Sequence, residues 1–133
     1  MDIVAPDVIG LALRILLAVA FIGMGVTHFL HAVQRTMAAM IPPPLRWKGI
    51  ASPRNLVIFT GLCEIAGGLG LLYPPTIIAA SICLIVFLVA VFPANAYAAA
   101  HRERFGWAAF PLIPRLIGQI VLIVLLVVGA LLA

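Results

Sequence analysis

Four stretches of about 20 mostly apolar residues dominate this chain and constrain its fold more than any other feature. They run from about 8 to 30, 55 to 72, 76 to 97 and 112 to 132. A helix needs about 20 such residues to cross the hydrocarbon core of a bilayer. Since only 9% of the 133 residues are charged, too few polar side chains remain to cover a soluble domain. The sequence therefore predicts a single all-α domain over 1–133, an integral membrane four-helix bundle.

Prolines separate these stretches, because proline stops a helix or starts its first turn. Those in the connections are Pro42, Pro43, Pro44, Pro53, Pro74, Pro75, Pro111 and Pro114. Pro93 differs, since it lies inside the third stretch. There we expect it to kink the helix near its end and to free a backbone carbonyl.

Basic residues gather in two of the connections, which orients the protein in the membrane. Residues 31–54 contain four Lys or Arg and no acid, and residues 98–111 contain Arg102 and Arg104 with Glu103. The positive-inside rule places both loops in the cytoplasm and both termini on the opposite side of a cell inner membrane. Arg14 is the one charge against this orientation, and it can snorkel outward. The net charge of +4 then reflects topology rather than nucleic-acid binding.

Aromatic residues agree with this orientation, since they gather at the proposed cytoplasmic boundary as an interfacial belt does. They are Phe29, Trp47, Tyr97, Phe105 and Trp107. The segment from His31 to Met40 is too long to continue the first span. It either lies along the interface or folds back toward the bundle, or it is a solvated loop.

The two cysteines, Cys63 and Cys83, form no CxxC pair, so neither a metal site nor a thiol-exchange site is indicated. Small apolar core side chains are the simplest interpretation, although a disulfide between neighbouring helices stays open. No Ser/His/Asp set of a hydrolase is recognisable, and we predict no catalytic residue. The acidic start and Arg14 do not favour a cleaved signal peptide.

Glu64 is the most informative polar residue inside an apolar stretch. It lies about 13 Å along the second helix from Asn55, near the centre of the bilayer. Thr60, Gly61 and Gly68 share its face by helical spacing. Because small residues mark close helix packing in membranes, Glu64 should point into the bundle, either protonated or paired with a cation. It is either a structural clasp between helices or a proton-linked, ligand-contacting carboxylate.

Four further polar residues complete a predicted intramembrane cluster with Glu64 and Thr60: His28, Asn95, Arg115 and Gln119. Each has a simpler interpretation as well. His28 fits an interfacial histidine, Asn95 fits repair of hydrogen bonding beside Pro93, and Arg115 fits contact with lipid headgroups. Together they predict a polar pocket that opens toward the cytoplasm, with Gln119 bridging Arg115 to Glu64.

Four spaced motifs, spread over about residues 20–120, resemble the DoxX-like family of small membrane proteins. They are Gly25-x-x-His28-Phe29, Met40-Ile41-Pro42-Pro43, Thr60-Gly61-x-x-Glu64-Ile65-x-Gly67-Gly68-x-Gly70-Leu71-Leu72 and Val91-Phe92-Pro93-Ala94-Asn95. The resemblance implies a four-helix membrane bundle. It also implies a loose link to redox systems, since some relatives accompany thiol or quinone oxidoreductases. The chain lacks the closely spaced cysteine pair of a thiol-exchange protein.

Three functions are compatible with these features. The favoured one is an accessory component of a membrane redox or envelope-stress system, which binds a quinone as a lipophilic ligand and contacts a membrane-associated oxidoreductase. The second is a proton-linked small transporter that uses Glu64. The third is an assembly factor for another membrane protein. The bilayer is the expected partner in all three, and four short helices leave a homo-oligomer open.

Overall fold

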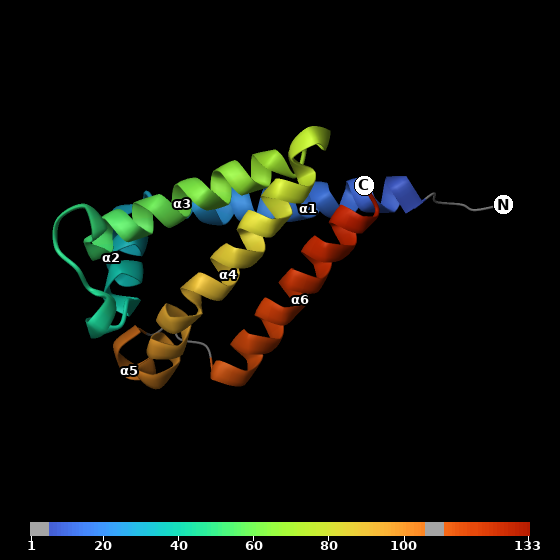
Figure 1. Ribbon diagram of the computed structural model, residues 1–133. Coiled ribbons are helices and arrows are strands. Elements are labelled where there is room, and N and C mark those ends of the chain that lie inside the picture. Colours follow the sequence, from blue (N-terminus) through green and yellow to red (C-terminus); the bar gives the residue numbers. More distant parts are fainter. Residues whose placement is uncertain (1–5, 106–110) are drawn as a thin grey trace.

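The chain folds entirely into helices over the part that the structure describes (Figure 1). This computed structural model describes residues 6–105 and 111–133, without the side chains of Pro6 and Arg102. Its α-helices are α1 (Pro6–Thr27), α2 (His31–Met40), α3 (Pro53–Gly70), α4 (Ile77–Ala100), α5 (Arg102–Phe105) and α6 (Leu112–Leu131). Its 3-10 helices are η1 (Pro43–Leu45), η2 (Gly49–Ala51) and η3 (Pro74–Thr76). The predicted all-α class is confirmed; Trp107 and the rest of 106–110 lie outside the described residues.

Three of the helical segments are long and apolar enough to cross a membrane, which is consistent with a membrane protein. They are Asp7–Thr27, Pro74–Ala100 and Leu112–Leu131. In α6 only 11% of the most apolar 18-residue segment is buried, so most of that helix presents apolar side chains outward. The second predicted stretch forms α3, which is less apolar because it begins Pro53-Arg54-Asn55 and contains Glu64.

The helix ends differ slightly from the predicted stretches. α1 ends at Thr27 rather than near residue 30, because the amides of His28, Phe29 and Leu30 bond three residues back and tighten the last turn. α4 continues through Pro93 to Ala100, three residues beyond the predicted end at 97. Pro93 therefore does not end the helix.

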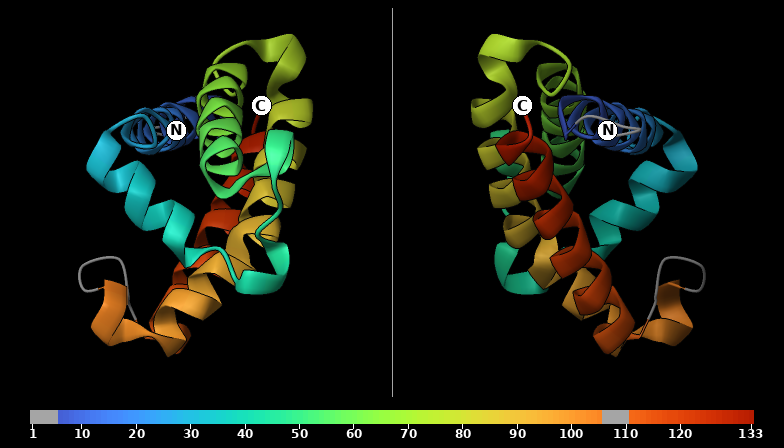
Figure 2. Two further views of the ribbon diagram at one scale, coloured as in Figure 1. Left: turned by 90° about the vertical axis from the view of Figure 1, so that its left-hand side faces the viewer. Right: turned by 90° about the vertical axis from the view of Figure 1, so that its right-hand side faces the viewer.

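Each long helix packs against its neighbours in the chain, and α6 returns to α1. The start of α1, the end of α6 and the α3–α4 connection lie at one end of the molecule (Figure 1). From that end the α4–α6 pair diverges from the α1–α3 pair, as both side views show (Figure 2). The main core lies where the pairs converge, and its buried residues are Leu17, Phe21, Leu71, Ala80, Leu84, Leu88 and Leu126.

Helix α2 bridges the two pairs at their diverging end, where it contacts both α3 and α4 (Figure 2). Its Met40 forms a second small core with Ala98 and Phe105. Arg46 closes the C-terminal end of α2 by donating to the carbonyl oxygens of Ala39 at 2.8 Å and Ile41 at 2.7 Å. Of the three predicted alternatives for this segment, folding back toward the bundle is confirmed.

Candidate functional site

Glycines bring α1 and α3 into backbone contact at the site. A Cβ atom on Gly25 would lie 2.7 Å from the carbonyl oxygen of Gly61 and 3.1 Å from Cβ of Glu64. A Cβ atom on Gly61 would lie 2.8 Å from Cβ of His28 and 3.0 Å from the carbonyl oxygen of Gly25. Only a residue without a side chain fits at either position. This close approach places His28, at the end of α1, directly against Glu64 in the middle of α3.

His28 and Glu64 form a buried pair, in which Nε2 of the imidazole lies 3.1 Å from Oε2 of the carboxyl group. Their exposed fractions are 5% and 4%. The other ring nitrogen, Nδ1, lies 3.1 Å from the carbonyl oxygen of Val57 and 3.2 Å from Oγ1 of Thr60. Three of the predicted site residues, His28, Thr60 and Glu64, are therefore brought together.

The hydrogen-bond partners of the ring determine where its protons are. Thr60 donates its hydroxyl proton to the carbonyl oxygen of Val57 at 2.8 Å. Both groups facing Nδ1 are therefore acceptors, so Nδ1 carries a hydrogen. In a neutral imidazole Nε2 would then be a bare acceptor, and an ionised Glu64 would oppose it with a second lone pair. A proton on either Nε2 or Oε2 would relieve this opposition, which makes the pair a candidate proton-binding site.

Gln34 of α2 also belongs to this site, although it was not among the predicted site residues. It is 7% exposed, and its side-chain amide donates to the carbonyl oxygen of His28 at 3.0 Å. That carbonyl lies just beyond the end of α1, where backbone acceptors lack helical partners. Gln34 thus ties α2 to the residue that carries the imidazole. A polar residue on the apolar side of the short 31–40 segment was the signal available in the sequence.

Two other predicted residues form a separate contact between α4 and α6. Arg115 donates from Nη1 to Oδ1 of Asn95 at 2.9 Å. Gln119 does not join Arg115 to Glu64 as predicted. Its Oε1 is buried with no hydrogen-bond partner among residues 6–105 and 111–133. The bridge fails because α6 packs mainly on α4 and α1, so one predicted cluster becomes two.

Arg14 does not reach outward as predicted. It is 8% exposed and donates from Nη1 to the carbonyl oxygen of Gly129 at 2.8 Å. Gly129 lies in the last turn of α6, where carbonyls lack helical partners and the helix dipole favours a cation. Arg14 therefore fastens α1 to the end of α6.

Other candidate chemistry is sparse in the described part of the chain. Cys63 and Cys83 are free thiols. No group of three or more His, Cys, Asp or Glu among the described residues is placed to hold a metal ion.

Comparison with known proteins places most of the chain in one family. A family model described as "Domain of unknown function (DUF8561)" matches residues 17–130, which include every residue of the site. No curated protein and no solved structure matches the chain.

Proposed function

The chain belongs to the DUF8561 family, whose shared domain has no known function. We therefore propose a function from the geometry of the chain's own residues. The protein is a four-span membrane bundle in which the His28–Glu64 pair holds a proton and offers it to a lipophilic, quinone-like ligand. It serves as an accessory component of a membrane redox or envelope-stress system, beside a membrane-associated oxidoreductase. The observation that carries the proposal is the 3.1 Å contact between two buried titratable groups, His28 and Glu64.

In the proposed topology α3 crosses the membrane together with α1, α4 and α6. Two findings support this: α3 lies in backbone contact with α1, and the four helices have comparable lengths. The loops 31–54 and 98–111 then lie in the cytoplasm, and both termini lie on the opposite side.

Cysteine labelling distinguishes four spans from three. In a Cys63→Ala/Cys83→Ala background, an impermeant maleimide added to intact spheroplasts should label Tyr73→Cys. It should reach Ile50→Cys only after permeabilisation, because α3 lies between these two exposed positions. If α3 does not cross, both positions will label from the same side, and the four-span topology is wrong.

A quinone-like ligand suits the site because its carbonyl oxygens accept hydrogen bonds and, on reduction, protons. Although Oε2 of Glu64 lies close to Nε2, it receives no well-directed hydrogen bond from the described residues. It therefore retains the capacity for a further partner. The resemblance to DoxX-like proteins supports the same assignment, since it implies a link to quinone or thiol oxidoreductases.

Glu64→Gln tests the proposal, because glutamine keeps the shape of the side chain but cannot bind or release the proton. We expect the variant in nanodiscs to bind a short-tailed ubiquinone about tenfold more weakly than the native protein, the equivalent of one lost hydrogen bond. Ser81→Ala, a buried polar change on α4, is the matched control and should bind normally. Equal binding by the native protein and Glu64→Gln would contradict a ligand at this pair.

The same pair supports a second function, proton-linked transport, because a protonatable group inside a bundle can alternate between two states. A measurement of proton flux into liposomes distinguishes a transporter from a quinone-binding accessory protein. A transporter should move protons without an added quinone and should stop when Glu64 is replaced by glutamine. An assembly factor would instead retain a stable protein partner and show no flux.

A further inference from the structure

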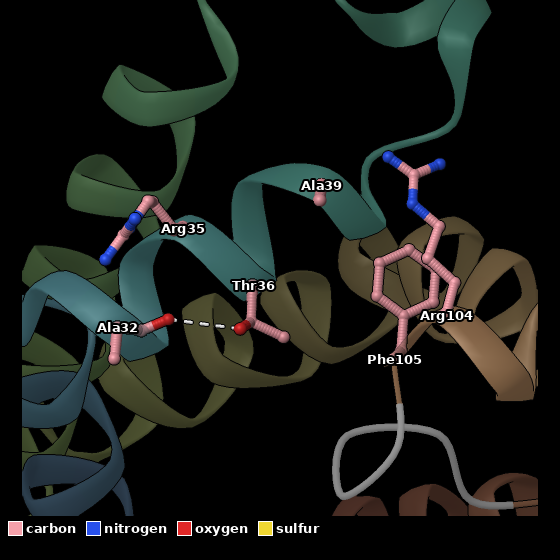
Figure 3. A pocket seen from close by; sticks show the side chains of 6 residues that line it. All are labelled: Ala32, Arg35, Thr36, Ala39, Arg104 and Phe105. Carbon is pink, nitrogen blue, oxygen red and sulfur yellow. Dashed lines mark hydrogen bonds between the residues drawn. The ribbon is translucent and has the colours of Figure 1, made fainter.

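A basic hollow lies between α2 and α5, away from the His28–Glu64 pair (Figure 3). It is a wide, open hollow on the surface with a volume of about 410 Å³. The residues that line it are Ala32, Arg35, Thr36, Ala39, Arg104 and Phe105. Arg35 and Arg104 stand toward its two ends, with Thr36 and Ala39 between them (Figure 3).

Neither arginine at the hollow is neutralised by a carboxylate in the described part of the chain. Arg35 is exposed and has no hydrogen-bond or ion-pair partner there. Arg104 donates to the hydroxyl of Tyr97 at 3.4 Å and stacks over Phe105 at 5.3 Å, and both partners are neutral. Glu103, the one acid on α5, lines a neighbouring hollow together with His101 and Arg104, and it forms no ion pair with Arg104 in the described part of the chain. The hollow therefore has two guanidinium groups at its edge that form no ion pair within the described residues.

The surface between the two arginines is apolar. Ala32 and Ala39 supply most of it, since Phe105 borders the hollow but is itself buried in the second core. The hydroxyl of Thr36 is occupied by the carbonyl oxygen of Ala32 at 3.1 Å. Two cations flanking an apolar surface match an amphiphile, with an anionic group for the guanidinium groups and a hydrocarbon chain for the rest. A basic pocket between helices on the cytoplasmic side of a membrane protein is a typical headgroup site.

We infer that this hollow binds the phosphate-bearing headgroup of an anionic phospholipid, with Arg35 and Arg104 as its cationic ligands. The inference rests on the proposed placement of α2 and α5 at the cytoplasmic boundary and is independent of the His28–Glu64 pair. The bound lipid would join the two short helices that lie where the long helix pairs diverge. The same guanidinium chemistry would also accept free phosphate, so the test must separate the two sources.

Native mass spectrometry of the full-length protein from nanodiscs tests the inference. In phosphatidylcholine with phosphatidylglycerol, the native protein should retain phosphatidylglycerol. The Arg35→Gln/Arg104→Gln variant should retain less, by about fivefold for each arginine removed. Arg54→Gln is the control, because it removes an exposed cation of the same loop that does not line the hollow. Excess inorganic phosphate should leave lipid retention unchanged if lipid is the ligand.

Two more variants show whether a loss of lipid in Arg35→Gln/Arg104→Gln comes from the missing charges or from misfolding. Arg35→Lys/Arg104→Lys keeps the charge and should restore most of the retention, whereas Thr36→Phe fills the hollow, keeps both arginines and should lower it. Equal retention of phosphatidylcholine, or full retention by the double glutamine variant, would overturn the inference. Displacement of the lipid by inorganic phosphate would overturn the lipid assignment in favour of free phosphate. Glu64→Gln should retain the lipid normally, so a failure here is distinct from a failure of the proton-binding proposal.

Discussion

Replacing His28 by alanine should lower the free energy of unfolding by about 3–5 kcal/mol, the usual cost of removing one partner from a buried ionic pair. The variant strands Glu64, which is 4% exposed and has no other side-chain partner within the described residues. It also leaves the carbonyl oxygen of Val57 with one donor fewer. Titration with SDS in mixed micelles, followed by circular dichroism, measures the change.

His31→Ala is the matched control for this experiment, because His31 is exposed at the start of α2. A surface change of this kind should stay within about 0.5 kcal/mol. The double variant His28→Ala/Glu64→Ala should cost less than the sum of its single changes, since the second change removes the stranded group. Strict additivity would show that the two residues do not interact, and the assignment of a proton-binding pair would fail.

Replacing Gly25 by alanine should destabilise the protein by about 1–3 kcal/mol, the usual cost of overpacking. The added Cβ would meet the backbone of α3 at 2.7 Å, so the helices must separate and the His28–Glu64 contact must lengthen. This loss should exceed the gain of about 1 kcal/mol that alanine normally brings to a helix interior. The quinone binding of the variant should fall together with its stability.

Gly23→Ala isolates the effect of packing from that of helix propensity. Gly23 lies on the same helix two residues earlier, and a Cβ there would meet nothing within 4 Å. We expect this variant to be as stable as the native protein or slightly more stable. If Gly25→Ala behaves like Gly23→Ala, the backbone contact between α1 and α3 is not needed for stability.

The sequence was informative where the signal lies along one helix. Apolar length and prolines predicted the long helices to within a few residues, and the small residues around Glu64 predicted that it points inward. The carboxyl group is indeed buried against α1. These properties follow from helical periodicity alone.

The rest depends on how helices pair, which periodicity does not determine. Gln119 fits a bridge to Glu64 only if α6 packs on α3, whereas it packs mainly on α4 and α1. The role of Gln34 depends on the turn that follows Thr27, because this turn directs α2 back toward the bundle. Arg14 was predicted to snorkel outward, but it bonds to a helix end that lies 115 residues later, which the sequence of α1 alone does not reveal.

The bond between Arg14 and Gly129 has a consequence for how the protein is made. Its donor belongs to the first long helix to leave the ribosome and its acceptor to the last, with 115 residues between them. At synthesis rates of about 5–20 residues per second, the guanidinium group waits roughly 6–23 s for its carbonyl. During that time an arginine in the membrane costs about 2.5–3.5 kcal/mol. The guanidinium group of Arg14 therefore gains this hydrogen bond only when the last helix arrives, and a chain that stops before residue 129 lacks the acceptor altogether.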